Sequence, residues 1–155
     1  SIDPTQQEGL FSVKLGECPV SFWSAQPLTG LTFPACLEAR PLLIPGRRSM
    51  LGRKILNWIT TQGLQVEILG EFDDAALMKA FGARKNAIFV APVLDEQDSG
   101  QRDAVTEVGR LDTVSEEYHI IFAERMIQHP AVQRLCHADF SGLFPRQSTD
   151  EKKPA

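Results

Sequence analysis

The sequence predicts an α/β fold in which a mostly parallel sheet is flanked by helices. Short apolar runs that fit buried strands alternate with segments of helical periodicity, which is the pattern of a layered α/β domain. The strand–helix–strand order implies right-handed crossovers, which leave consecutive strands parallel. The chain has 155 residues, of which 43% are hydrophobic and 23% are charged. A chain of this length and composition can bury a core without metals or disulfides.

The first elements are strands. Residues 10–15 and 18–23 are expected to form two strands around a tight turn at Gly16-Glu17. Residues 27–41, which include three prolines and one glycine, are expected to form a loop with a short helical turn at Ala35–Ala39.

A buried strand and an amphipathic helix come next. The run Leu42-Leu43-Ile44 is apolar and is stopped by Pro45-Gly46. Ser49 is a good N-cap for a helix that ends near Gln62 and is closed by Gly63. The residues that share its packing face are Leu51, Ile55, Trp58, Ile59 and Gln62.

The remainder also alternates strands and helices. Asp73 or Asp74 is expected to cap a helix that ends near residue 83. A last helix starts at Pro130, a residue suited to the first helical position, and ends near residue 140. The expected strands are residues 66–69, 87–91, 105–111 and 118–123, with a polar excursion at 95–103 and a disordered tail at 145–155.

Charge and cysteine content exclude several classes of protein. The chain has 16 Lys plus Arg against 20 Asp plus Glu, a net charge of −4. A stand-alone nucleic-acid or anionic-membrane binder needs a basic surface instead. Cys18, Cys36 and Cys136 are too scattered for a disulfide framework or a zinc site. We therefore expect free thiols, no cofactor, no metal, no membrane contact and a location in the cytoplasm.

The loop Gly46-Arg47-Arg48-Ser49 joins a strand end to a helix start. Exposed backbone N–H groups, the helix dipole and two guanidinium groups favour an anion pocket there. The alternative is that Ser49 only caps the helix while the arginines are solvated. The spacing matches neither a Walker A motif nor a nucleophile elbow.

Glu71, Asp73 and Asp74 lie at the next strand-to-helix loop. Three carboxylates could bind a cation, but hard cations such as Ca²⁺ take six or more oxygens. Capping of the helix is therefore the favoured interpretation.

The sequence contains no persuasive catalytic set. His119 falls in an expected strand, and Cys136-His137 are neighbours whose side chains point to different faces of a helix. We do not expect an enzyme. Leu77, Met78 and Phe81 form an apolar stripe, which is typical of a core and can also serve a protein contact.

Three segments resemble LysR-type transcriptional regulators. They read LLIPGRRSMLGRK at 42–54, EILGEFDDAALMKAFG at 67–82 and FAERMIQHPAVQR at 122–134. The resemblance extends over nearly all of residues 2–144. It implies a two-lobed effector domain with the type 2 periplasmic-binding fold. Residues 1–117 would then be lobe two with the first crossover, and residues 118–144 would return to lobe one. The N-terminal winged helix-turn-helix and the first half of lobe one would lie outside this chain.

The resemblance also implies a site and partners. A small ion or anion effector would bind between the lobes, against the loops Gly46–Met50 and Phe72–Asp74. Leu77, Met78 and Phe81 would contact a second subunit of a homodimer or tetramer. The family members most like this chain activate a sodium/proton antiporter gene under sodium or alkaline stress, through promoter DNA bound by the N-terminal domain. The alternative function is a small α/β solute-binding module for an anion, without a role in transcription.

Two features conflict with a simple transfer of the family's site. The family's Gly-x-Gly turn before the strand that ends at Pro92 reads Lys85-Asn86-Ala87 here. Two arginines at a helix N-terminus attract anions and repel cations such as sodium. We therefore expect sodium to act indirectly and Arg47, Arg48 and Ser49 to form the polar half of the cleft.

Overall fold

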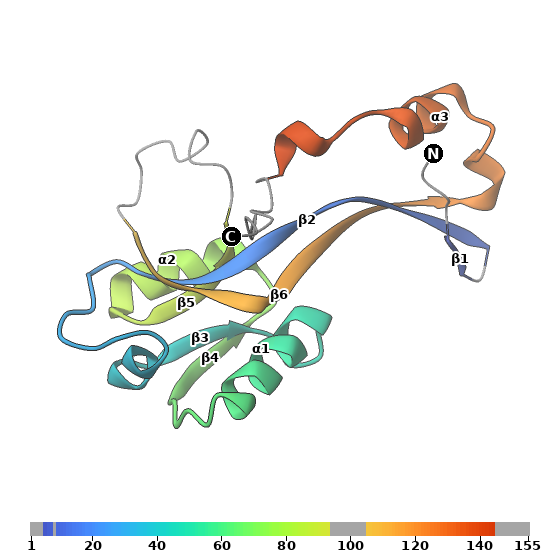
Figure 1. Cartoon of the computed structure of the whole chain (residues 1–155). Helices are drawn as coiled ribbons and strands as arrows, with labels where there is room; N and C mark the ends of the chain where they lie inside the picture. Colours follow the sequence, from blue (N-terminus) through green and yellow to red (C-terminus); the bar gives the residue numbers. More distant parts are fainter. Residues whose placement is uncertain (1–4, 8, 94–104, 145–155) are drawn as a thin grey trace, which may run out of the picture. The chain divides into compact units, whose positions relative to one another are not determined.

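Figure 1 shows the chain as a computed structural model, which describes residues 5–7, 9–93 and 105–144. The chain divides into two units, Cys18–Glu116 and Ser1–Glu17 with Glu117–Ala155. Residues 1–17 therefore group with the returning segment, whereas the sequence placed them with lobe two. The expected excursion at 95–103 and the expected tail at 145–155 lie outside the described residues.

The larger unit is built on a parallel sheet. Strands β3 (Leu42–Pro45), β4 (Ile68–Phe72) and β5 (Ile88–Pro92) are parallel, with β3 in the middle. Strand β2 (Leu10–Ser24) pairs antiparallel with β5, and strand β6 (Thr106–Ala123) pairs with β2. The predicted α/β class is confirmed, with a parallel core that antiparallel pairing extends on one side.

Two helices cover opposite faces of this sheet (Figure 1). Leu42 and Ile44 lie in one buried cluster with Ile55, Trp58 and Ile59 of α1 (Met50–Thr61). The intervening Leu43 lies in a second cluster with Met78 of α2 (Ala75–Lys85), Ala87 and Phe89. Successive side chains of a strand point to opposite faces, so β3 supplies both cores. This explains why its apolar run does not alternate with polar residues.

The predicted starts of α1 and α2 are confirmed. The Ser49 Oγ accepts a hydrogen bond from the Gly52 N–H at 3.0 Å. Asp74, rather than Asp73, caps α2 and accepts from the Leu77 N–H at 2.9 Å. Gln62 is exposed and forms the C-cap of α1, so it does not join the packing face. Strand β4 begins two residues later than predicted and continues to Phe72, which pairs with Pro45.

The predicted turn at Gly16-Glu17 is wrong, because β2 is one strand of 15 residues. Gly16 is needed for a close approach, since a Cβ at this position would overlap the ring of Phe144. The two runs expected at 105–111 and 118–123 also form a single strand, β6. The polar residues between them occupy a strand that buries Leu111 and Val114, so strand pairing outweighs their low apolar content.

The smaller unit contains β1 (Thr5–Gln7), which pairs antiparallel with β2, and α3 (Pro130–His137). Helix α3 starts at Pro130 as predicted and ends three residues earlier than expected, with the short helix η4 (Ser141–Leu143) beyond it. The described residues also form the short helices η1 (Ala35–Ala39) and η3 (Glu124–Met126). Within the described part of the chain, no helix is long and apolar enough to cross a membrane.

Candidate functional site

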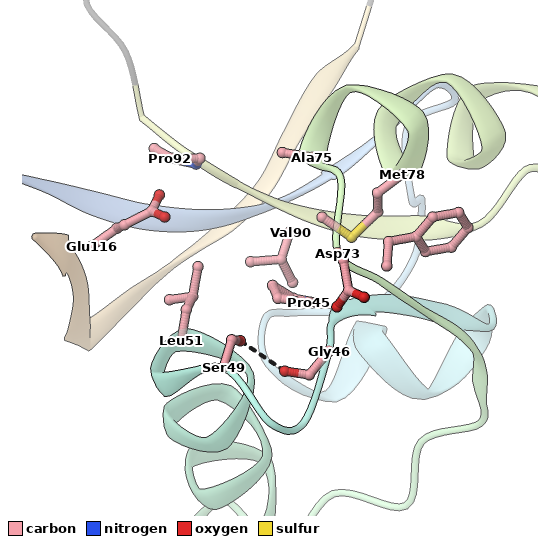
Figure 2. Close-up of a pocket in the computed structure, with 11 residues that line it drawn as sticks. Pro45, Gly46, Ser49, Leu51, Asp73, Ala75, Met78, Val90, Pro92 and Glu116 are labelled. Atoms are coloured by element: carbon pink, nitrogen blue, oxygen red, sulfur yellow. Dashed lines mark hydrogen bonds between the residues drawn. The ribbon is translucent and has the colours of Figure 1, made fainter. Parts of the chain in front are cut away.

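A pocket of about 200 Å³ lies in the larger unit at the carboxyl ends of its parallel strands (Figure 2). Pro45, Phe72 and Pro92, the last residues of β3, β4 and β5, all line it. In open α/β sheets, ligands bind at this edge, where loops lead from strands into helices. The pocket therefore lies beside the strand-to-helix loops for which the sequence predicted a cleft.

The pocket has apolar walls and a few polar groups. Ser49, Asp73 and Glu116 contribute polar side chains. The remaining lining residues are Pro45, Gly46, Leu51, Phe72, Ala75, Met78, Val90 and Pro92. An apolar surface with a small number of placed polar groups is typical of a small-molecule site.

Hydrogen bonds fix the loop between β3 and α1. The Ser49 hydroxyl donates to the Gly46 carbonyl at 2.7 Å, and the Gly46 N–H donates to the Phe72 carbonyl at 3.0 Å. Gly52 lets the first turn of α1 approach this loop, because a Cβ on Gly52 would lie 2.6 Å from the Pro45 carbonyl oxygen. The pocket wall is thus held by the Ser49 hydroxyl and by close contacts between backbone groups.

The two arginines do not line the pocket. The Arg47 guanidinium pairs with Glu71, its Nε donating to Oε1 at 2.5 Å, and its backbone N–H donates to Oε2 at 3.0 Å. These side-chain and backbone hydrogen bonds from Arg47 lower the pKa of Glu71, and the carboxylate raises the pKa of Arg47. Arg48 and Met50 are exposed. Of the predicted cleft residues, the structure brings Gly46, Ser49, Phe72 and Asp73 together around the pocket.

The three carboxylates that were weighed as cation ligands serve different purposes. Glu71 pairs with Arg47, Asp74 caps α2, and Asp73 faces the pocket. Among the described residues, no group of three or more His, Cys, Asp or Glu side chains could hold a metal ion. The interpretation of Glu71, Asp73 and Asp74 as a joint cation site is therefore wrong.

The apolar stripe of α2 divides between surface and core. Leu77 and Phe81 are 59% and 38% exposed, and the Phe81 ring lies 5.6 Å from that of Phe72. Met78 is 2% exposed and packs with Leu43 and Phe89. Met78 is therefore a core residue, and its prediction as a subunit contact is wrong, because its side chain points to the sheet.

Sequence reasoning missed Glu116 as a lining residue. No motif connects residue 116 to the strand ends 24 or more positions before it. Pro92 was predicted as a strand end, and that position is the signal that could have placed it at the pocket.

A hydrogen-bonded chain in the smaller unit was also missed. His119 joins the Ser12 hydroxyl at 3.1 Å through Nδ1 and the Glu117 carboxylate at 3.1 Å through Nε2. These residues lie on β2 and β6, and His119 and Glu117 are exposed. The sequence separation of 107 residues between Ser12 and His119 hides this contact from any local pattern.

The fold is that of the regulatory domains of LysR-type transcriptional regulators. The cofactor-binding domain of the Cbl regulator matches with a TM-score of 0.64 and 19% identity, over 89% of this chain and 62% of that one. CbnR, a LysR family regulator, matches with a TM-score of 0.63 and 17% identity, over 84% of this chain and 46% of that one.

At the sequence level, the chain is 70% identical over 143 residues to the transcriptional activator protein NhaR of Escherichia coli. The match covers 92% of this chain and 48% of the relative, so the chain spans about half the length of NhaR. The same figures hold for NhaR of Shigella flexneri. No family model matches the chain.

Proposed function

We propose that the chain is the effector-binding part of a LysR-type transcriptional activator and works in the cytoplasm. The observation that carries the proposal is the pocket at the carboxyl ends of β3, β4 and β5. It occurs in a chain that is 70% identical over 143 residues to a transcriptional activator. A ligand there would contact the loops that lead into α1 and α2. Ligand binding would then change the packing of two helices instead of driving a chemical reaction.

The loops that would contact the effector are Gly46–Met50 and Phe72–Asp74. Gly46, Ser49, Phe72 and Asp73 line the pocket and support this assignment. Arg47, Arg48, Met50 and Asp74 would act at its rim or through the loop backbone. The signal would be sodium or alkaline stress and the target a sodium/proton antiporter gene. That part of the proposal rests on the sequence resemblance.

The regulator would act as a homo-oligomer. Leu77 and Phe81 on α2 are large apolar side chains exposed to solvent, as a subunit contact requires. Promoter DNA would be bound by the half of the regulator that this chain does not match. The net charge of −4 supports that division, because DNA contact requires a basic surface.

Residues 118–144 would belong to lobe one. This segment and the start of β2 expose several large apolar side chains, which a complete lobe would cover: Leu10, Ile121, Met126, Leu135 and Leu143. Several exposed large apolar side chains in so small a unit support a packing partner for it.

A hybrid activator tests the proposal. The half of Escherichia coli NhaR that this chain does not match is joined to this chain, and transcription from a promoter activated by NhaR is measured. We expect activation to be retained. A hybrid carrying Ile55→Asp, which places a charge in the core of the larger unit, is the control and should be inactive.

Two further outcomes decide between the functions. A hybrid that is soluble and binds the promoter but fails to activate would overturn the proposal and favour the solute-binding module. Equal transcription with sodium chloride and with potassium chloride would overturn sodium as the signal. Equal transcription in neutral and in alkaline medium would overturn alkaline stress as the signal.

A further inference from the structure

A second pocket, of about 350 Å³, lies in the larger unit between α1 and the first half of β6 (Figure 1). Small-molecule sites have volumes of roughly 300–1,000 Å³, so this pocket is large enough for a small ligand. The residues that line it are Lys54, Asn57, Trp58, Thr61, Gln62, Asp112, Thr113 and Val114. None of these residues lines the pocket at the strand ends, so the two pockets are separate.

The spacing of residues along α1 gives this pocket its helical wall. Asn57 and Trp58 follow Lys54 by three and four positions, and Thr61 comes one turn later, so the four side chains share one stripe of the helix. Trp58 and Val114 are each 6% exposed and belong to the core of the larger unit. The pocket therefore has a fixed apolar base and polar sides.

The Asp112 carboxylate is oriented by the indole of Trp58. Trp58 Nε1 donates a hydrogen bond to Asp112 Oδ1 at 3.2 Å. The Trp58 ring packs against Phe22 and Phe33, with centroids 5.7 and 5.8 Å apart, so its N–H points in a fixed direction. Asp112 Oδ2 accepts no hydrogen bond from a described residue and can serve a ligand. A carboxylate that is ordered beforehand loses less entropy when a ligand binds.

Lys54 brings the opposite charge to the same pocket. Lys54 is partly buried and makes no hydrogen bond or ion pair with any described residue. Asp112 also has no ion-pair partner in the described part of the chain. A simple anion would be attracted by Lys54 and repelled by Asp112, and the reverse holds for a simple cation. A ligand that carries both charges is attracted by both residues.

The end of α1 favours one orientation of such a ligand. Thr61 and Gln62 place the carboxyl end of the helix at the pocket, and the last turn contains no basic residue. The free carbonyl groups of a helix end carry partial negative charge and attract a cationic group. The ammonium group of the ligand therefore belongs at this end, beside Asp112, and its carboxylate belongs at Lys54, two turns earlier in the helix.

We propose that the pocket between α1 and β6 binds a small zwitterion such as a free amino acid, with its ammonium group at Asp112 and its carboxylate at Lys54. The side-chain amides of Asn57 and Gln62 and the hydroxyl of Thr113 supply further hydrogen-bonding groups. This site is additional to the effector pocket of the proposed function and does not depend on it.

The two tryptophans of the chain provide a test with an internal control. The Trp58 indole N–H bonds Asp112, whereas the Trp23 indole N–H bonds the Ala91 carbonyl at 3.2 Å, outside this pocket. The full chain, labelled with nitrogen-15, is titrated with glycine, β-alanine and 4-aminobutyrate at one ionic strength. We expect at least one of them to shift the Trp58 indole resonance saturably while the Trp23 resonance stays in place.

Ligands with a single charge test the need for both charges. Butyrate and butylamine have the carbon chain of 4-aminobutyrate, and each lacks one of its two charged groups. Each should bind at least about fivefold more weakly than the best of the three zwitterions, because one charged contact is lost.

Variants test the two residues. Lys54→Gln and Asp112→Asn each remove one charge and retain a hydrogen-bonding group, and each should weaken binding of the best zwitterion about fivefold or more. Lys79→Gln and Glu67→Gln are the matched controls, because they make the same changes of charge outside the lining and should leave the affinity unchanged. The dispersion of each spectrum shows that the variant is folded.

Three results would overturn the inference. The first is the absence of a saturable shift of the Trp58 resonance with all three zwitterions. The second is binding of butyrate or butylamine as tight as that of the best zwitterion. The third is unchanged affinity in either Lys54→Gln or Asp112→Asn. Each of these results would leave the proposed effector pocket at the strand ends intact.

Discussion

Arg47 and Glu71 are joined by both the side chain and the backbone of the arginine, across the ends of two neighbouring parallel strands. The guanidinium Nε donates to Oε1 at 2.5 Å and the backbone N–H donates to Oε2 at 3.0 Å. The pair connects the loop after β3 to β4, and neither Arg47 nor Glu71 is among the residues that line the pocket.

The Glu71 carboxyl should titrate below the ordinary glutamate range. The side-chain hydrogen bond to Arg47 lowers its pKa most, followed by the backbone hydrogen bond. A lowered pKa in the folded state means that the stabilisation is present above the ordinary range and is lost as the pH falls through the lowered pKa. NMR titration of the carboxyl carbon measures this. In Arg47→Gln the midpoint should rise towards the ordinary value, whereas in Arg48→Gln it should not move.

Removing the indole of Trp58 should destabilise the larger unit by about 3–5 kcal/mol. Its ring lies 5.7 Å from that of Phe22 and 5.8 Å from that of Phe33, and the side chain is nearly buried. Urea unfolding followed by circular dichroism compares Trp58→Ala with Leu31→Ala, an exposed residue whose loss should cost less than about 0.5 kcal/mol. Equal losses for the two variants would contradict the assigned core.

Gly52→Ala should destabilise the fold by about 1–3 kcal/mol, the usual cost of overpacking. The added Cβ meets the carbonyl oxygens of Pro45 and Gly46, and backbone atoms cannot move aside as a flexible side chain can. Gly142→Ala is the control, because a Cβ at that position meets nothing within 4 Å. A thermal midpoint of Gly52→Ala equal to that of the parent chain would show that the α1 start is less tightly packed than described.

Phe81→Asp should weaken self-association of the hybrid regulator while leaving the chain folded. Phe81 and Leu77 are exposed on α2, so a charge there affects a partner more than the core. Met78→Asp, in the same helix, should instead unfold the larger unit because Met78 is 2% exposed. Sedimentation velocity measures the first effect, and unchanged association of Phe81→Asp would exclude this face as the contact.

Local patterns predicted the parts of the fold that local interactions determine. The cap at Ser49, the strand at Leu42 and the helix start at Pro130 each depend on a few neighbouring residues. Gly16 was taken for a turn because its real partner, Phe144, is 128 positions away in the sequence. The local sequence around Gly16 fits both a continuous strand and a turn, and only the position of the Phe144 ring distinguishes them.

Four of the predicted cleft residues, Gly46, Ser49, Phe72 and Asp73, line the pocket, whereas Arg47 and Arg48 do not. The strand-to-helix loops were identified because strand ends and caps are visible in the sequence. The pairing of Arg47 with Glu71 and the approach of Glu116 depend on the register of β3 against β4 and on the path of β6. No spacing within the sequence encodes either relationship.

The double burial of β3 has a consequence for how its register is specified. A strand with one solvent-exposed face is held in register because a slip by one residue would expose its apolar side chains. Leu42, Leu43 and Ile44 are all fully buried, so a slip would exchange one apolar side chain for another. The alignment of β3 must then come from its end, where the Gly46 N–H bonds the Phe72 carbonyl and Gly52 packs against Pro45. The segment that forms the wall of the pocket thus also sets the alignment of the central strand, so substitutions in this wall are constrained by folding.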